Sequence, residues 1–334
     1  MIRLQSITRF LRFVLEKVKI FLRFRAYYTI NDKNDTILVI QLNILYNPII
    51  ITADAEKERE KIKVAKNFKN FLPTIKKEVK VWELIYWWIL RALMIFALIY
   101  TIVVGHGPMG DYKGSNPWQQ VAANLVGMFA YEIIQLFFKE DSFFRNLSPR
   151  FQNITALGFF LGSFGGAFMN LYYSLPMYDK VLHALGTAEA VYVGYEIICA
   201  MQIKLKKPCP FQIAVLCALG IGFIFSTGWE IFEFSYDQFA GGDAQHWNVL
   251  NALDEAGGDW RNVFLMFPVK DETTFMSRFP LMDTMADTVM NFVGGIIMYI
   301  VLRIKPYRHT GPNDINARIE AENAAEKENT AKAE

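Results

Sequence analysis

The chain has 334 residues, 53% of them hydrophobic, and its mean hydropathy of +0.17 makes it more apolar than an ordinary soluble domain. Its net charge of +2 gives no reason to expect a nucleic-acid partner. The three cysteines form neither a disulfide framework nor a Cys-x-x-Cys metal motif. Charge is concentrated near the two ends and in the connections, and long runs almost free of charge lie between them, which predicts a membrane protein.

The first 80 residues are expected to form a small basic cytoplasmic or interfacial extension. Within residues 1–28, apolar residues recur at helical spacing, at Ile7, Phe10, Val14, Val18 and Phe21. With the basic residues around them, that pattern is typical of a helix lying among anionic lipid headgroups, although a helix packed on another part of the protein would show it too. Residues 36–51 are β-branched and short for a span, which favours one or two strands, and residues 54–80 predict a Lys-rich helical approach to the membrane.

Six apolar segments follow, each long enough to cross the ~30 Å hydrocarbon core of a bilayer. Their predicted bounds are 82–104, 121–138, 154–175, 181–201, 211–234 and 285–302. Residues 305–334 are rich in Ala, Glu, Lys and Asn and are expected to form a solvated helix or a disordered polar tail. The predicted division is therefore an extension over 1–80, a transmembrane domain over 81–304 and a cytoplasmic tail over 305–334.

The positive charges predict the orientation of these spans. Lys and Arg gather before the first span, in the second and fourth connections and after the last span, whereas the alternate connections are acidic. Because basic connections stay on the cytoplasmic side, both termini are expected inside the cell. The predicted fold is an all-α integral protein of the plasma membrane with six transmembrane helices, and the sequence assigns no oligomeric state.

Three pairs of ionisable residues then fall at the same outer level of the bilayer. One pair opens the fourth span, one closes the fifth and one opens the sixth: Asp179 with His183, Glu230 with Glu233, and Asp283 with Asp287. The members of each pair are three or four residues apart, so both lie on one face of a helix. Ionisable groups at membrane depth usually face a bundle interior or a water-filled cavity. We therefore expect the six side chains to converge on one outward-facing cavity.

Five carboxylates so close together would repel one another unless some are protonated or a cation lies among them. Carboxylate oxygens with one imidazole suit Mg²⁺, Mn²⁺ or Fe²⁺, or Zn²⁺ at low coordination number. The six residues are therefore the predicted metal ligands, although a proton-binding site fits the same pattern. For Asp179, Glu233 and Asp283, which lie near predicted helix ends, simple solvation is the competing interpretation.

Other polar residues inside the predicted spans carry weaker predictions. Arg91 and Glu189 fall at similar depths, so an ion pair between them would neutralise both. Glu132 and Glu196 also lie within predicted spans. His309 belongs to the tail and is expected to be solvated rather than ligating.

The motifs of the last three spans resemble those of a known group. Asp-Lys-x-x-His begins at Asp179, Trp-Glu-x-x-Glu at Trp229 and Asp-Thr-x-x-Asp at Asp283. In this order they resemble the YjdF-type inner-membrane proteins, a family of unknown function that is itself similar to the VanZ-like membrane proteins. The resemblance spans residues 82–304 and implies that the family pattern falls on the same six residues. Members usually carry a Gly-Asp pair before the last motif, where this chain has Phe279-Pro-Leu-Met.

Three functions fit the acidic constellation. The first is a permease that binds cations or protons at the outward-facing site, although the chain shows no internal three-plus-three repeat. The second is a metal-dependent hydrolase or transferase embedded in the membrane and acting on a lipid-linked phosphate, for which no nucleophile motif is present. The third is a non-catalytic envelope scaffold whose acids are structural. No catalytic residue is predicted, and a divalent metal is the one cofactor that the pattern indicates.

Overall fold

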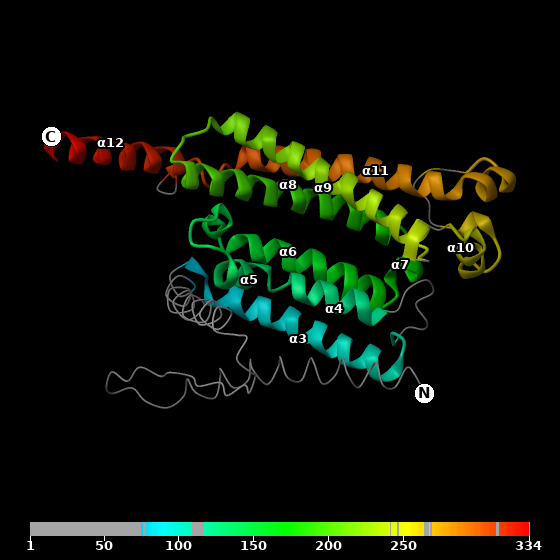
Figure 1. Cartoon of the computed structure of the whole chain (residues 1–334). Coiled ribbons are helices and arrows are strands. Elements are labelled where there is room, and N and C mark those ends of the chain that lie inside the picture. Colours follow the sequence, from blue (N-terminus) through cyan, green and yellow to red (C-terminus); the bar gives the residue numbers. More distant parts are fainter. Residues whose placement is uncertain are drawn as a thin grey trace, which may run out of the picture. The chain divides into compact units, whose positions relative to one another are not determined.

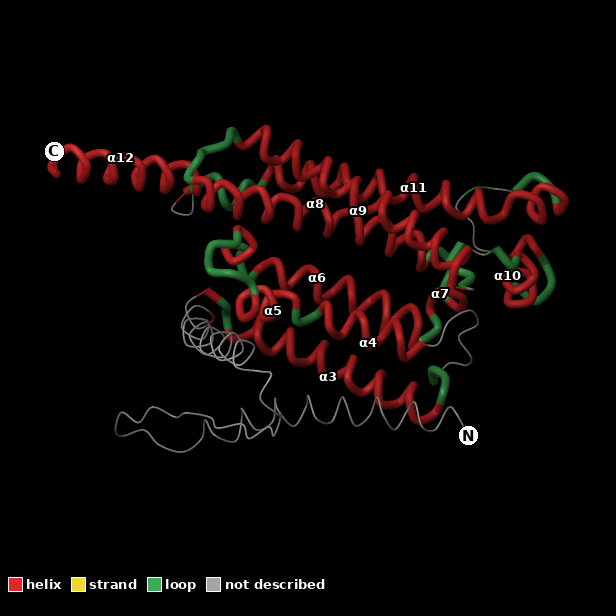
Figure 2. The backbone as a smooth tube through the Cα atoms, viewed as in Figure 1, coloured by secondary structure: helices red, strands yellow, loops and turns green. Residues whose placement is uncertain are grey.

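The computed structural model describes residue 75 and residues 78–108, 117–240, 242–245, 247–263, 267, 269–311 and 314–333. In this part of the chain the regular elements are helices (Figure 2), which confirms the predicted all-α class for these residues. The predicted amphipathic helix over 1–28 and the predicted strands over 36–51 lie outside the described residues, as does most of the approach over 54–80.

In the first group of helices, α3 packs against α4, α6 and η2 (Figure 1). The members of this group are α3 (Val81–Val104), α4 (Pro117–Gly127), α5 (Ala130–Phe137), the 3₁₀ helix η1 (Phe143–Asn146), α6 (Arg150–Phe160) and the π helix η2 (Leu161–Phe168). α3 ends at Gly105, whose φ of 93° is a left-handed conformation that glycine adopts without a side-chain clash. η2 continues α6 without a break, so α6 and η2 are one continuous helical segment.

The second group is built on α8, which packs against both α9 and α11 (Figure 1). Its elements are α7 (Leu171–Ser174), α8 (Tyr178–Leu205), α9 (Phe211–Ala240), α10 (Val249–Glu255), the 3₁₀ helix η3 (Trp260–Asn262), α11 (Glu272–Ile304) and α12 (Ile315–Ala333). α8 also contacts η1, α6 and η2, and so it joins the second group to the first.

Several of these helices have the length and composition of membrane spans. Among the described residues, α3, α8, α9 and α11 are each long and apolar enough to cross a membrane, and α4 with α5 makes a fifth if that bent pair is one span. Large apolar side chains such as Val103, Ile224 and Ile304 are more than two-thirds exposed. Outward-facing apolar side chains of this kind are what lipid-facing helices present.

A bend of 52° separates α4 from α5, where the sequence predicts one continuous span. The Met128 carbonyl at this break accepts hydrogen bonds from Arg91 Nε at 3.1 Å and from Arg91 Nη2 at 2.6 Å. Arg91 Nη2 also lies 2.7 Å from Glu132 Oε1. The predicted Arg91–Glu189 pair is therefore wrong. The guanidinium instead donates to the backbone carbonyl left free at the break and pairs with Glu132, because the bend brings both groups within its reach.

The ends of three helices also differ from their predicted positions. α9 continues past 234 to Ala240, and α11 begins at Glu272 instead of at 285. The prediction ended both spans at their acids, whereas these acids face neighbouring helices and the helices run on past them. The third segment stops at Phe168, since Asn170 takes a left-handed φ of 55°.

Small residues set how closely α8 approaches its neighbours. A Cβ on Gly294 of α11 would collide with the Ala184 carbonyl of α8, and one on Gly222 of α9 would collide with the Val191 side chain. Close helix contacts in membranes depend on such small residues. This packing holds the three helices at the separation that the site below requires.

The predicted polar tail begins as a packed segment. Ile315 and Ile319 of α12 are buried against a core that includes Tyr195 and Cys199 of α8. Beyond this first turn and a half α12 is mostly exposed, as the expected solvated helix would be. The tail is therefore anchored to the bundle at its start and solvated towards its end.

Candidate functional site

The six predicted residues come together in the structure, and a seventh, Lys180, lies among them. We call this set the acid cluster: Asp179, Lys180 and His183 from α8, Glu230 and Glu233 from α9, and Asp283 and Asp287 from α11. It lies at the end of the bundle where α8 begins and α9 ends. The predicted convergence of the three pairs is thus seen in the geometry.

Lys180 is the centre of one side of the cluster. Its Nζ donates hydrogen bonds to Asp179 Oδ2 at 2.9 Å, Asp283 Oδ1 at 2.5 Å and Asp287 Oδ2 at 2.9 Å. Because an ammonium group has three N–H donors, these bonds use all of them. The Lys180 side chain is only 3% exposed, so the charge is neutralised by the acids rather than by water.

His183 joins this side of the cluster to the other. Its Nε2 lies 3.6 Å from Asp179 Oδ1 and 3.5 Å from Asp287 Oδ1, and its Nδ1 lies 3.3 Å from Glu230 Oε1. These distances are longer than a good hydrogen bond, so the ring is held loosely among carboxylates. Both ring nitrogens therefore face acidic oxygens, as ligands around a shared cation do.

A polar pair supports Glu230 from beneath. Asn291 Nδ2 donates to Glu230 Oε1 at 3.1 Å, and Thr187 Oγ1 donates to Asn291 Oδ1 at 2.7 Å. The next turn of α8 presents Val191, which is fully buried. Towards the middle of α8, the cluster is therefore followed first by a polar layer of Thr187 and Asn291 and then by an apolar layer at Val191.

The cluster does not lie at the tips of α9 and α11. Glu233 is seven residues before the end of α9 at Ala240, and Asp283 is eleven residues after the start of α11 at Glu272. At ~1.5 Å per residue, both helices extend more than about 10 Å beyond the acids. Simple solvation at a helix end is thus not the environment of Glu233 or Asp283. The cluster is accessible at Asp179, whose side chain is 30% exposed.

The charges of the acid cluster do not balance. Five carboxylates share one ammonium group, and His183 adds at most one further positive charge. Glu230 Oε2 is buried without a hydrogen-bond partner, whereas both carboxylate oxygens of Asp287 lie within 2.9 Å of Lys180 Nζ. Buried acceptors without donors are rare in folded proteins and call for an ion or protons.

Two sets of side chains place ligand atoms within 4.8 Å of one another. One is Asp179, His183 and Asp287, and the other is His183, Glu230 and Glu233. Asp283 belongs to neither, because it faces Lys180. Carboxylates with an imidazole fit Mg²⁺, Mn²⁺, Fe²⁺ or Zn²⁺, so the donor chemistry agrees with the predicted metal.

Lys180 is the residue of the cluster that the sequence prediction missed. It lies between Asp179 and His183 in the same motif, in the first turn of α8. A count of charges could have predicted its role. Acids that converge from three helices need a buried cation, and Lys180 is the basic residue within that motif.

A second polar cluster lies around Glu196, in the C-terminal half of α8. Glu196, which is fully buried, accepts hydrogen bonds from Ser148 N at 3.3 Å, Ser148 Oγ at 2.9 Å and Arg308 Nη1 at 2.6 Å, and also from Tyr307 Oη. We call these four residues the Glu196 cluster. Burial alone would lower the pKa of Arg308, but the Glu196 carboxylate holds it above its ordinary value, and burial raises the pKa of Tyr307.

His309 packs beside the Glu196 cluster, so the expectation that it is solvated is wrong. Only 7% of the residue is exposed, and its Nδ1 lies 2.6 Å from the hydroxyl oxygen of Tyr195, within hydrogen-bond distance. Burial lowers the pKa of His309 because it disfavours the imidazolium ion. The chain folds back after α11, and this turn buries His309. The polar residues around it in the sequence had predicted that it is exposed to solvent.

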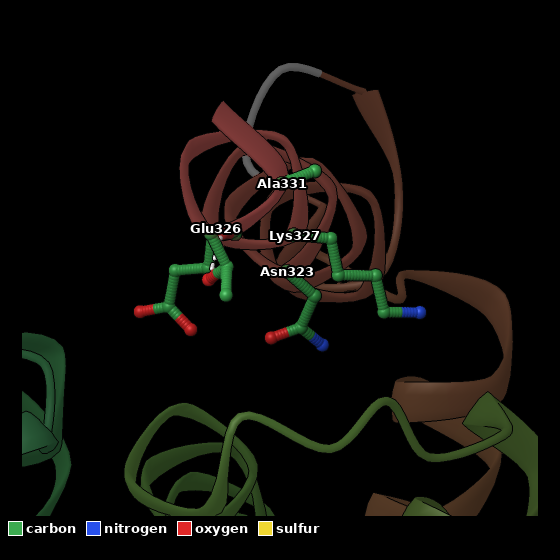
Figure 3. A pocket seen from close by; sticks show the side chains of 5 residues that line it. Asn323, Glu326, Lys327 and Ala331 are labelled. Carbon is green, nitrogen blue, oxygen red and sulfur yellow. Dashed lines mark hydrogen bonds between the residues drawn. The ribbon is translucent and has the colours of Figure 1, made fainter. Parts of the chain in front are cut away.

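A pocket is lined by side chains of α12 (Figure 3). These are Asn323, Glu326, Lys327, Thr330 and Ala331. Asn323 Nδ2 donates to the Lys206 carbonyl at 3.0 Å, and Glu326 pairs with the Lys206 side chain. These exposed contacts join α12 to the α8–α9 connection and offer no grouping of catalytic or ligating side chains, so the acid cluster is the candidate site.

Comparison with known proteins gives a family. The family model described as "Predicted membrane protein (DUF2238)" matches residues 85–307, which is more than half of the chain and includes the whole acid cluster. No curated protein and no solved structure matches the chain. The match does not test the expected likeness to VanZ-like proteins, which stays a prediction. The chain therefore belongs to the DUF2238 family of predicted membrane proteins, the YjdF-like proteins.

Proposed function

We propose that this protein is a permease of the cell membrane with a binding site at the acid cluster. The bound species is either a divalent metal ion or protons. The observation that carries the proposal is the unbalanced charge: the cluster holds five carboxylates and a single lysine, and Glu230 Oε2 is buried without a donor. Ionisable residues inside membrane helices mark ion and proton pathways. Asp179, His183, Glu230, Glu233 and Asp287 are the candidate ligands, because they make up the two sets of close ligand atoms, whereas Asp283 faces Lys180.

We propose six spans with both termini in the cytoplasm. The span added to the five above is third in chain order. It consists of the 11 residues of α6, which run directly into the 8 residues of η2. The α8–α9 connection carries Lys204, Lys206 and Lys207, and the segment after α11 is also basic. Both lie at the end of the bundle opposite to the acid cluster, which supports a cytoplasmic position for that end. The acid cluster then faces outside, and the basic residues 1–80 form the extension that binds anionic headgroups.

The apolar layer under the cluster supports access from one side at a time. Val191 is fully buried, and Gly222 of α9 packs directly on it. A transported ion would enter from the exposed side at Asp179 and cross only after α8 and α9 separate at this layer. In the proposed permease, this arrangement would correspond to the outward-facing state of an alternating-access cycle.

Flux through reconstituted protein tests the proposal. Liposomes containing the full chain are loaded with a Mn²⁺-quenched dye or with a pH-sensitive dye. We expect uptake of Mn²⁺ or of protons by the wild type and at least a tenfold loss in the Glu230→Gln, Asp287→Asn double variant. Asp259→Asn, which changes an exposed acid in the α10–α11 connection, is the matched control and should behave as wild type. Equal flux in the double variant, or none in the wild type, contradicts the proposal.

One observation favours a second function. The cluster is open at Asp179 and closed below Thr187, as a site that binds a headgroup from one side would be. A metal-dependent hydrolase or transferase acting on a lipid-linked phosphate would use the same ligands, with the cation polarising a phosphoryl oxygen. Release of phosphate from lipid-linked substrates by the wild type, lost in the double variant, would favour this function over transport.

A further inference from the structure

The Lys180 side of the acid cluster has the geometry of an occupied cation site. Three carboxylate oxygens, from Asp179, Asp283 and Asp287, lie 2.5 to 2.9 Å from Lys180 Nζ. Divalent cations such as Ca²⁺ hold carboxylate oxygens at about 2.3–2.6 Å. An ion at the position of Nζ would therefore need the three acids to move by only a few tenths of an ångström.

The Glu230 side has acceptors but lacks such a cation. Its polar contacts among the described residues come from neutral donors: Asn291 Nδ2 donates to Glu230 Oε1, and Trp229 Nε1 donates to Glu233 Oε1 at 2.7 Å. Glu230 Oε2 remains without a donor. The ring of His183 lies on the boundary, with Nδ1 towards Glu230.

A second observation shows which acceptor is left for an external ion. Asp287 Oδ1 lies 2.8 Å from Lys180 Nζ and 3.5 Å from His183 Nε2, so the lysine already neutralises this oxygen. Glu230 Oε2 is buried without a hydrogen-bond partner. It is the acceptor available to a cation beside His183.

We propose that Lys180 is a built-in cation that restricts the acid cluster to one external divalent ion, held by His183, Glu230 and Glu233. Removing its charge opens a second cation position among Asp179, Asp283 and Asp287. The inference rests on the proposed cation-binding function and explains why one chain would bind one divalent ion. A positive charge fixed in the cluster also repels a second ion, so Lys180 determines how many ions one chain carries.

Titration with Mn²⁺ alone tests this inference. The full chain in detergent is stripped with a chelator and dialysed against Mn²⁺, and bound metal is counted by mass spectrometry. We expect one Mn²⁺ per chain in the wild type and in Lys180→Arg, and two in Lys180→Met. The Glu230→Gln, Glu233→Gln variant should bind none, and adding Lys180→Met to it should restore one.

The outcomes separate this inference from the proposed function. A Lys180→Met protein that still binds one ion with unchanged affinity overturns the inference and leaves cation binding intact. No ion in the wild type but one in Lys180→Met would show that Lys180 occupies a cation position, but it would overturn the one-ion stoichiometry and the divalent-metal form of the proposed function. If Lys180→Met is unstable, Lys180→Gln and unfolding with added Mn²⁺ replace the count: rescue of folding by Mn²⁺ supports the inference, and absence of rescue in both variants overturns it.

Discussion

The acid cluster and the Glu196 cluster lie in opposite halves of α8, and both bury acids inside a helical bundle. At the Glu196 cluster one carboxylate meets one guanidinium, and four donors occupy its oxygens. At the acid cluster five carboxylates share one lysine, and Glu230 Oε2 is buried without a donor. A buried acid that is balanced and fully hydrogen-bonded holds the fold, whereas an excess of acid needs something from outside.

The largest effect is expected from breaking the balanced cluster. Glu196→Gln removes the charge that pairs with Arg308 and leaves a largely buried guanidinium without a counter-ion. Loss of one partner from a buried pair costs ~3 kcal/mol or more, so the free energy of unfolding should fall by that order. Denaturant unfolding in detergent measures it.

Glu233→Gln is the matched control for this experiment, because it makes the same change at the acid cluster. Neutralising one of several repelling acids should leave the metal-free protein as stable as the wild type or slightly more stable. Equal destabilisation by the two variants would remove the distinction between the clusters.

A smaller effect is expected from separating the helices that form the acid cluster. Gly294→Ala places a Cβ against the Ala184 carbonyl and forces α11 away from α8. Overpacking of this kind costs ~1–3 kcal/mol, and displacement of Asn291, which donates to Glu230, should weaken Mn²⁺ binding. Gly186→Ala is the control, since nothing lies within 4 Å of a Cβ there. Unchanged Mn²⁺ affinity in Gly294→Ala would show that the cluster does not depend on this contact.

The smallest effect on stability is expected when the pH is lowered and His309 becomes protonated. Burial, which Arg308 reinforces and Asp314 opposes, lowers its pKa, so the folded state prefers the neutral ring. Stability from this group is present above the ordinary pKa of about 6.5 and is lost as the pH falls through the lowered value. Melting temperatures at pH 7.5 and 5.5 should therefore differ more in the wild type than in His309→Gln. A pH dependence that is the same in both proteins would contradict this.

The sequence could predict the six acidic and histidine residues because helical spacing puts each pair on one face. The membrane class also followed, since several apolar runs of this length match the thickness of a bilayer. Lys180 was missed because a lysine near a helix start is usually solvated, and its burial depends on acids more than a hundred residues away. The Arg91 contacts depend on the bend between α4 and α5, which no local motif announces.

The positions of helix ends show a second limit of the sequence. A hydropathy profile ends a span at its charges, but the charges of α9 and α11 face a partner helix and the helices continue. His309 illustrates the reverse case, because a polar segment folds back and buries one of its side chains. In both cases the environment of a polar side chain is set by tertiary packing, which the local sequence does not contain.

The most direct test of the central claim is to count the metal bound to protein purified without added ions. Mass spectrometry would compare the wild type with the Glu230→Gln, Asp287→Asn double variant. We expect a stoichiometric divalent metal in the wild type and none in the double variant. Metal-free wild-type protein whose melting temperature equals that of the double variant would contradict a metal site and would leave the acid cluster to protons or to a structural role.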